Sequence, residues 1–204
     1  MNIAIIGSGN VGGALARRWV LAGHTVVVGA KFPLSEKSLQ LAAVIGEDKF
    51  THLAPALKQC EVVLIATPPA AIFELMDEMG DLTGKIIIDA TNAVRQKPAP
   101  YDTVYHALAA RTTAQVVKCF NSTGFENMLD PVYQGEKIDM FMAGDSAIAK
   151  QAAHQLALDA GFAACWDFGN ADKVVLLEQF ALSWINLAIM QGHGRDIAFR
   201  LVRR

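Results

Sequence analysis

The stretch Asn2-Ile3-Ala4-Ile5-Ile6-Gly7-Ser8-Gly9-Asn10-Val11-Gly12 decides the fold. Its apolar run, Ile3 to Ile6, predicts a buried strand, and the residues from Gly13 to Leu21 predict a helix. The G-x-G-x-x-G pattern therefore lies between a strand and a helix, which is the setting in which such a turn binds a dinucleotide. The alternative, a glycine-rich turn that binds nothing, is less well supported because strand, turn and helix all occur in the required order.

Each glycine of this turn has a different expected role. Gly7 allows the sharp turn that leaves the strand, and Gly9 lets the backbone approach a pyrophosphate because it lacks a Cβ atom. Gly12 allows the helix to pack closely against the first strand. The N-terminus of that helix then offers free N–H groups and a partial positive charge to the phosphates.

The end of the second predicted strand, Thr25 to Val28, bears on the choice of nucleotide. Enzymes that bind NAD place an acidic residue about 20 residues after the motif, where it accepts from the ribose 2′-hydroxyl. Here the sequence is Gly29-Ala30-Lys31, with no acid, and the Lys31 ammonium can pair with a 2′-phosphate. We therefore expect NADP, the alternative being that Lys31 is a solvated loop residue. Arg17 and Arg18 are expected on the solvent face of the first helix.

Composition limits the class of protein. With 204 residues, 52% hydrophobic and 19% charged, the chain is long enough and apolar enough for a compact α/β protein. A net charge of −2 gives no electrostatic signal for nucleic acid. The cysteines, Cys60, Cys119 and Cys165, form no C-x-x-C pattern and indicate buried thiols in a reducing compartment, with no metal site. The chain enters a core strand at once, so no signal peptide and a cytoplasmic location are expected.

Apolar runs alternate with helical segments along the chain, which predicts a Rossmann-type, doubly wound parallel sheet. Further strands are expected at Phe50–His52, Glu61–Ala66, Lys85–Ala90 and Gln115–Phe120. Helices are expected at Ser35–Ile45, Pro69–Met79 and Thr103–Arg111, with a further small helix that ends at Gln59. We expect residues 1–122 to form the NADP-binding domain, and residues 123–204 to form a small C-terminal α/β and helical extension. That extension is predicted to contain strands at Ile138–Ala143 and Ala163–Asp167, and helices at Ser146–Ala160 (capped by Asp145 or Ser146), Ala171–Gln191 and after Gly194.

The apolar segment Val174–Met190 is interrupted by Glu178, Gln179 and Asn186 and is short for a membrane span. We interpret it as a buried or interface helix. Its apolar residues occupy most faces, which predicts a homodimer through this helix, the alternative being that it forms the centre of the extension.

Ligands of open α/β sheets bind beyond the carboxyl ends of the strands, where this sequence has small or polar residues. The predicted cofactor-binding residues are Gly7, Ser8, Gly9, Asn10, Val11, Gly12, Ala30, Lys31, Ala66, Thr67, Pro68, Thr91 and Asn92. The predicted residues for a second substrate are Asn121, Ser122, Met190, Gly192 and Gly194. Turn and cap chemistry is an equal alternative for Thr91, Asn92, Asn121 and Ser122, and helix termination is the simpler one for the two glycines. No catalytic side chain is identified.

Four segments carry a family resemblance: the opening Asn2–Gly12, the second strand Ala22–Gly29, Val117-Lys118-Cys119-Phe120-Asn121-Ser122-Thr123, and Phe141-Met142-Ala143-Gly144-Asp145. Together they resemble the NADP-dependent reductases that use the deazaflavin coenzyme F-420. The resemblance implies hydride transfer between NADP(H) and a flavin-like or deazaflavin acceptor. Those reductases often carry His where this chain has Asn121, so a flavin or a quinone-like acceptor is equally open. The chain also resembles the reductase domain of six-transmembrane metalloreductases.

Two other functions remain possible from the sequence. A β-hydroxyacid-type dehydrogenase begins in the same way, but it needs a larger helical domain than the residues after Asp167 allow. An NADP-binding sensor or scaffold would keep the Gly7–Gly12 turn without turnover. The Tyr133-Gln134-Gly135-Glu136-Lys137 pattern matches a short-chain dehydrogenase pair, but Pro131 and Gly135 argue against the helix it requires.

Overall fold

A computed structural model describes residues 1–30, 32–94 and 96–204 of the chain. Its main feature is a single eight-stranded sheet in the order β10-β9-β6-β5-β4-β1-β2-β3. The strands are β1 (Asn2–Ile6), β2 (Thr25–Gly29), β3 (Phe50–Thr51), β4 (Val62–Ile65), β5 (Ile86–Asp89), β6 (Gln115–Cys119), β9 (Met140–Ala143) and β10 (Cys165–Asp167). The first six are parallel, which confirms the predicted Rossmann-type sheet. β9 joins β6 in the antiparallel direction and β10 is parallel to β9, a reversal that the sequence analysis does not predict.

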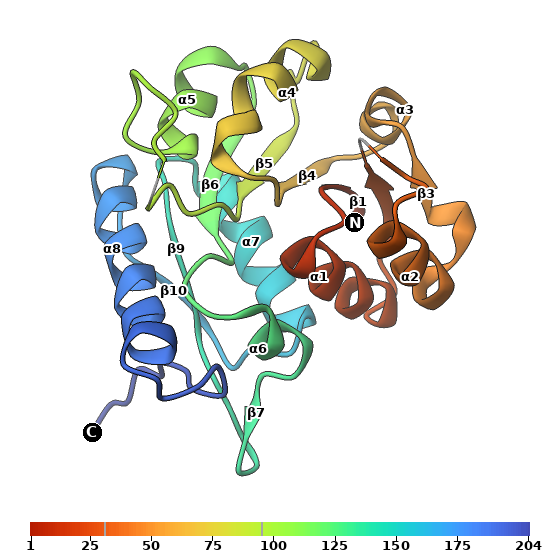
Figure 1. Cartoon of the computed structure of the whole chain (residues 1–204). Helices are drawn as coiled ribbons and strands as arrows, with labels where there is room; N and C mark the ends of the chain where they lie inside the picture. The colour runs from red at the N-terminus through yellow and green to blue at the C-terminus, as the bar shows by residue number, and fades with distance from the viewer. Residues whose placement is uncertain (31, 95) are drawn as a thin grey trace.

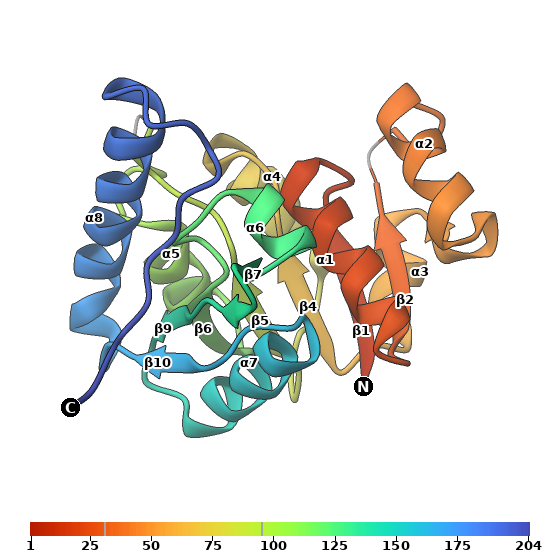
Figure 2. The same cartoon turned by 90° about the horizontal axis from the view of Figure 1, so that it is seen from below.

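Helices cover both faces of the sheet (Figures 1 and 2). One hydrophobic cluster includes residues of α1 (Asn10–Leu21), α2 (Glu36–Ile45), α6 (Phe125–Leu129) and α7 (Ala147–Asp159). A second cluster includes residues of α3 (Leu53–Lys58), α4 (Ile72–Met79), α5 (Val104–Arg111) and α8 (Val174–Ile185). Short 3-10 turns occur at Glu47–Lys49, Pro69–Ala71 and Ala171–Lys173, and a π-helical turn at Asn186–Met190 follows α8. Strands buried on both faces explain the continuous apolar runs in the sequence.

Three helices begin at a side-chain cap. The hydroxyl of Ser35 accepts from the Ser38 N–H, that of Thr103 from the His106 N–H, and that of Ser146 from the Ala149 N–H. Each cap satisfies a backbone donor that the first helical turn leaves without a partner. Of the two predicted caps for α7, Ser146 is the one used.

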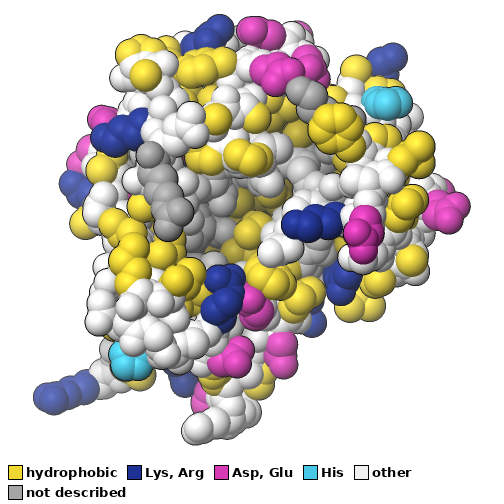
Figure 3. All heavy atoms as spheres, in the orientation of Figure 1, with side chains coloured by type: hydrophobic (Ala, Val, Ile, Leu, Met, Phe, Trp, Pro, Cys, Tyr) yellow, Lys and Arg dark blue, Asp and Glu magenta, His cyan; other side chains and the backbone are white. Residues whose placement is uncertain are grey.

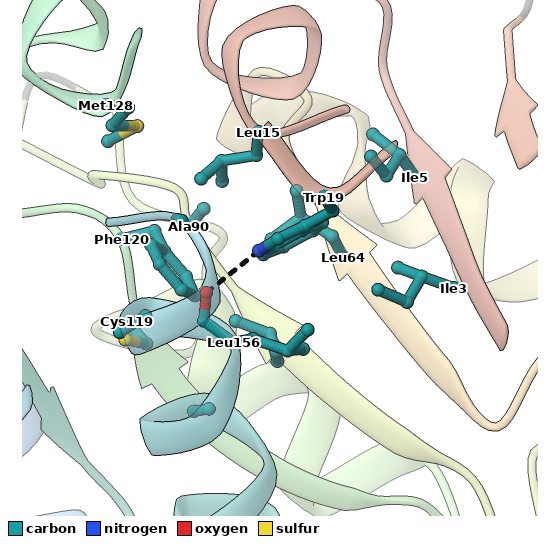
Figure 4. Packing of buried hydrophobic residues seen from close by; sticks show 14 of the residues in the cluster. Ile3, Ile5, Leu15, Trp19, Leu64, Ala90, Cys119, Phe120, Met128 and Leu156 are labelled. Atoms are coloured by element: carbon teal, nitrogen blue, oxygen red, sulfur yellow. Dashed lines mark hydrogen bonds between the residues drawn. The ribbon is translucent and has the colours of Figure 1, made fainter. Parts of the chain in front are cut away.

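The core beneath the glycine-rich turn is organised around Trp19 (Figure 4). The indole is fully buried, and its Nε1–H donates to the carbonyl oxygen of Leu156 at 2.9 Å, which joins α1 to α7. The edge of its ring meets Phe120, with centroids 5.5 Å apart. Phe120 has a φ of +60°, a left-handed conformation that is uncommon for a residue other than glycine. This conformation turns the chain at the end of β6, immediately before Asn121.

The segment between β6 and β9 contains two elements that the sequence analysis does not predict, α6 and a hairpin of β7 (Val132–Tyr133) and β8 (Glu136–Lys137). In the register of this hairpin, Tyr133 pairs with Glu136 and Val132 with Lys137. Tyr133 and Lys137 therefore do not lie on a helix, and the rejection of the short-chain dehydrogenase pattern is confirmed.

The helix predicted after Gly194 is wrong, because residues 191–204 contain no helix. The segment instead runs back beside α8 (Figure 2). The carbonyl oxygen of Ile197 accepts from Trp184 Nε1 at 2.6 Å and from Asn127 Nδ2 at 2.7 Å. These tertiary hydrogen bonds hold the backbone in an irregular conformation, and they overrule a weak helical propensity.

The helical run Ala171–Met190 is, by length and composition, apolar enough to cross a membrane. One third of its most apolar window is buried inside the protein, where Val174, Leu177 and Trp184 pack. The same test is passed by core helices, so the run is weak evidence for a span.

Candidate dinucleotide and acceptor site

The glycine-rich turn has the geometry that its sequence predicts. Gly7 has a φ of +115°, and a Cβ atom there would lie 2.5 Å from the carbonyl oxygen of Ala66. A Cβ atom at Gly12 would lie 2.0 Å from the carbonyl oxygen of Gly7. At Gly9, in contrast, a Cβ atom would have no neighbour within 4 Å. Gly7 and Gly12 are therefore required by the fold, whereas Gly9 faces open space.

A cavity of about 660 Å³ opens on one side of this turn. It is bounded by the carboxyl ends of β1, β2 and β4 and by the helices that follow. Of the predicted cofactor-binding residues, it is lined by Gly7, Ser8, Gly9, Ala30, Ala66, Thr67 and Pro68, together with residues such as Phe32, His52, Leu53 and Leu75. Lys31 lies outside the described residues. The lining is mainly apolar with a few polar groups, as is typical of a nucleotide site.

A second cavity of about 550 Å³ lies on the other side of the turn. Five predicted residues line it, namely Asn10, Val11, Asn92, Asn121 and Met190. The rest of its wall comes largely from the α8 region and from α6, with Phe125, Leu182, Trp184, Ile185, Ile189 and Arg195. Figure 3 shows this face of the molecule hollowed near its centre, with hydrophobic side chains around the hollow. The two cavities lie on either side of the glycine-rich turn. Two ligands, one bound in each cavity, would therefore meet beside this turn.

Three buried polar atoms at the ends of β4, β5 and β6 have no hydrogen-bond partner among residues 1–30, 32–94 and 96–204: Thr67 Oγ1, Thr91 Oγ1 and Asn121 Oδ1. Asn92 and Asn121 hold each other, since Asn92 Nδ2 donates to the Asn121 carbonyl at 2.8 Å and Asn121 Nδ2 donates to Asn92 Oδ1 at 3.0 Å. This pairing leaves Asn121 Oδ1 as a fixed acceptor. Buried polar atoms without partners are rare, and a bound ligand is a common explanation. The ribose hydroxyls and carboxamide of a nicotinamide nucleotide carry the donors and acceptors that such atoms need.

A buried ionic cluster, which the sequence did not predict, adjoins Thr91 and Ala93. Lys118 Nζ lies 3.0 Å from Asp89 Oδ2 and 2.6 Å from Glu178 Oε1, and it donates to the Thr91 carbonyl at 2.5 Å. Asp89 Oδ1 accepts from the Thr91 N–H, and Glu178 Oε2 from the Ala93 N–H. The Lys118 and Asp89 side chains are completely buried, and that of Glu178 is 7% exposed. One signal was present in the sequence, because a lysine inside an apolar strand and a glutamate inside an apolar helix both need partners.

The remaining predicted substrate residues lie elsewhere. Ser122 is buried, and its hydroxyl lies 3.6 Å from Met140 Sδ. Gly192 and Gly194 have φ angles of +74° and +84° in the turn after the π-helical segment, and both are exposed. None of the three is among the residues that line the second cavity.

The prediction that Arg17 and Arg18 lie on the solvent face of α1 is only partly right, because both are half-buried. Arg18 Nε donates to the carbonyl oxygen of Ala160 at 2.8 Å, at the end of α7. Arg17 Nε is buried and has no hydrogen-bond partner in the part of the chain that the structure describes, and Arg17 lines a small cleft of about 130 Å³ together with Lys37. Arg18 therefore joins α1 to the end of α7, and Arg17 belongs to the wall of the small cleft.

Among residues 1–30, 32–94 and 96–204, no group of three His, Cys, Asp or Glu side chains is placed to hold a metal ion. All three cysteines are buried free thiols, and burial raises the pKa of Cys119 well above its ordinary value. The Cys119 and Cys165 sulfur atoms are 3.7 Å apart. A buried thiol with a raised pKa is a poor nucleophile, which indicates a structural role for Cys119.

The fold is a Rossmann-type sheet, and its two cavities flank the turn at which such sheets bind dinucleotides. Residues 2–93 match the family model described as NADP oxidoreductase, coenzyme F420-dependent, so the family resemblance is confirmed and supports an NADP-dependent oxidoreductase. A crystal structure from Arthrobacter sp. FB24, provisionally described as an F420-dependent NADP-reductase, has the same fold, with a TM-score of 0.86 and 24% identity over 100% of both chains. The hypothetical protein SMa0349 from Sinorhizobium meliloti is 24% identical with a TM-score of 0.72, over 100% of this chain and 96% of that one.

A curated relative is Metalloreductase STEAP2 of Mus musculus, 23% identical over 92% of this chain. The match covers 37% of the relative, so the chain spans little more than a third of its length.

Proposed function

We propose that this protein transfers a hydride between NADP(H) and a flat, flavin-like, deazaflavin or quinone-like acceptor. The observation that carries the proposal is the set of three partnerless polar atoms, Thr67 Oγ1, Thr91 Oγ1 and Asn121 Oδ1, at adjacent strand ends between two cavities. They suit a nicotinamide held between its own dinucleotide cleft and a second ring. The family match of residues 2–93 supports NADP as the nucleotide.

The glycine-rich turn is proposed to bind the pyrophosphate. The N-terminus of α1 follows Gly9 directly, and its free N–H groups favour an anion. Gly9 leaves the space that a phosphate would occupy. Thr67 and Pro68 are proposed to flank the nicotinamide ribose, and Thr91, Asn92 and Asn121 to approach the ring and its carboxamide.

Lys31 is proposed to pair with the 2′-phosphate of NADP, a role that rests on its place in the sequence. Changing Lys31 to Ala should reduce the preference for NADPH over NADH at least about tenfold, the order expected for a hydrogen bond to a charged group. The matched control is Lys58→Ala, which removes an exposed lysine at the end of α3. An unchanged preference in Lys31→Ala would refute this role.

The second cavity is proposed to hold the acceptor. Its apolar wall includes Trp184, Ile185 and Met190, which suits a flat ring, and its polar edge is formed by Asn92 and Asn121. Ser122, Gly192 and Gly194 do not line this cavity. A role for these three residues in binding the acceptor would require contacts that the described structure does not contain.

The chemistry asks little of the protein's side chains. Bound NADPH supplies two electrons and one proton as a hydride, and the acceptor takes up a further proton from water. The residues of the site orient two rings face to face, and the apolar wall excludes water from the space between them. No acid or base from the chain has to act on the reacting atoms, which agrees with the absence of an identified catalytic side chain.

The decisive experiment follows NADPH oxidation with a panel of flavins, deazaflavin and quinones, beside a calorimetric measurement of NADPH binding. Turnover with at least one acceptor supports the proposal. Tight NADPH binding without turnover on any acceptor would instead favour a sensor or scaffold. Failure to bind either nucleotide would refute both functions.

We further propose that the protein is a cytoplasmic homodimer joined through α8 and the turn after it. Leu176, Ile189 and Met190 are 54%, 55% and 60% exposed on this helical run. Burying these side chains in a partner would remove a large apolar patch from water. A monomeric mass by light scattering at micromolar concentration would refute the dimer. If a dimer is found, Leu176→Glu should convert it to a monomer while Leu21→Glu, at an exposed position on α1, should not.

A further inference from the structure

In the buried cluster of Lys118, Asp89 and Glu178, every polar atom of the three charged groups has a hydrogen-bond partner. The three N–H groups of an ammonium at Lys118 meet three acceptors, one each from Asp89, Glu178 and the Thr91 carbonyl. Each of the four carboxylate oxygens accepts from an N–H, either from Lys118 or from the backbone of Thr91 or Ala93. A protonated carboxyl would direct its O–H at a donor. The geometry therefore fits one ammonium and two carboxylates, with a net charge of −1.

This charge is placed beside the proposed nicotinamide site. Thr91 belongs to the cluster through both its N–H and its carbonyl, and its hydroxyl oxygen is one of the three partnerless atoms. The next residue, Asn92, lines the acceptor cavity. Thr91, which is bonded to the cluster, is therefore adjacent in sequence to a residue of the cavity wall. Because the cluster is buried, water screens its field weakly.

The two redox states of the nicotinamide differ in charge at the ring, which is positive in NADP⁺ and neutral in NADPH. On the basis of the proposed function, we propose that Lys118, Asp89 and Glu178 together favour the oxidised ring. Bound NADPH then becomes a stronger hydride donor. The cluster also holds the backbone of Thr91 and Ala93, so these three are positioning residues that act without touching the acceptor.

The inference further assigns a direction to the reaction. A site that stabilises the positive ring favours loss of hydride from the nicotinamide, which is reduction of the acceptor by NADPH. The reaction that supplies its reductant is therefore one that regenerates NADPH.

The test compares the dissociation constants of NADP⁺ and NADPH, measured by calorimetry on the whole chain. For charges on the order of 10 Å apart in an effective dielectric of about 20, removal of one unit charge changes an affinity about tenfold. Glu178→Gln should therefore raise the ratio of the NADP⁺ constant to the NADPH constant about tenfold. Asp89→Asn should move the ratio in the same direction. The control is Glu136→Gln, which removes an exposed carboxylate on β8 and should leave the ratio unchanged.

A merely structural role for the cluster would weaken both nucleotides equally, because the ring charge would not matter. Equal weakening, or an unchanged ratio in both variants, would overturn the inference while leaving the proposed function intact. Since each variant places an amide against a buried donor and so costs stability, the wild-type protein supplies an independent measurement. It should bind NADP⁺ more tightly than NADPH, and the opposite order would also overturn the inference. If the wild type binds neither nucleotide, the proposed function itself fails.

Discussion

The pair Gly9 and Gly12 provides the sharpest test of the site, because the same change has opposite consequences at two positions three residues apart. A methyl group at Gly12 would lie 2.0 Å from the backbone oxygen of Gly7 and 3.2 Å from Ile5 Cγ2. Backbone cannot move aside cheaply, so Gly12→Ala should destabilise the fold by about 3 kcal/mol, the upper end for overpacked sites. The added methyl group would displace the N-terminus of α1 from β1.

A methyl group at Gly9 meets nothing within 4 Å, and the backbone angles there, φ −71° and ψ −171°, are allowed for alanine. Gly9→Ala should therefore leave stability unchanged or raise it by about 0.4–1 kcal/mol, because the unfolded chain loses freedom. The new methyl group would occupy the space proposed for the pyrophosphate, so nucleotide affinity should fall at least about tenfold, which is about 1.4 kcal/mol.

The assay combines urea unfolding with calorimetric titration of NADPH on both variants and the wild type. Gly12→Ala should lower the unfolding midpoint, whereas Gly9→Ala should lose binding with its midpoint retained. A Gly9→Ala protein that binds NADPH as tightly as the wild type would show that the pyrophosphate does not approach this turn. Equal destabilisation by both changes would refute the distinction between a packing glycine and a binding glycine.

Three further predictions concern the rest of the fold. Trp19→Phe removes one of the two donors to the buried Leu156 carbonyl, which keeps the Ala160 N–H, and loss of this hydrogen bond should cost about 0.5–1.5 kcal/mol in urea unfolding; an unchanged midpoint would argue against the bond. The pKa of Glu126 lies below its ordinary value of 4.5. Burial raises this pKa, but the hydrogen bonds from Arg195 and the backbone, together with the charge of Arg195, outweigh the effect of burial. This lowered pKa stabilises the folded state above pH 4.5, and the contribution should be lost as the pH falls through the folded pKa; Glu126→Gln should flatten that part of the stability profile, and an identical profile would contradict the pairing. The three buried thiols should react with a thiol reagent only on unfolding, and rapid labelling of the native protein would contradict their burial.

Much of the fold follows from local sequence signals. The strand, turn and helix at the N-terminus, the parallel strands β1 to β6 and the cap Ser146 are all confirmed, because each depends on a short pattern. The direction of β9 was not predictable in the same way. An apolar run predicts a strand, but its direction is set by the length and path of the connection from β6, which contains α6 and the β7–β8 hairpin.

The site was predicted where it depends on strand ends and missed where it depends on distant partners. Rossmann topology brings the ends of β1, β2 and β4 together, so the residues of the first cavity follow from the element order. The cluster of Lys118, Asp89 and Glu178 joins positions separated by up to 89 residues, and no periodicity or spacing predicts that juxtaposition. The prediction of a helix after Gly194 was wrong for the same reason, since Ile197 is held by side chains from α6 and α8.

The fastened carboxyl-terminal segment has a practical consequence for anyone who shortens or extends the gene product. Besides the two bonds to Ile197, the Leu201 N–H donates to Asp139 Oδ2 at 2.7 Å, and Arg195 forms an ion pair with Glu126 beside the acceptor cavity. Deleting these last residues would leave Trp184 Nε1 and Asn127 Nδ2 short of an acceptor and loosen a cavity wall. Loss of activity in such a truncated protein would then reflect a disturbed cavity wall and not the removal of an active-site residue. An affinity tag added at the carboxyl terminus should carry a spacer, so that the tag does not disturb the hydrogen bonds of this terminal segment.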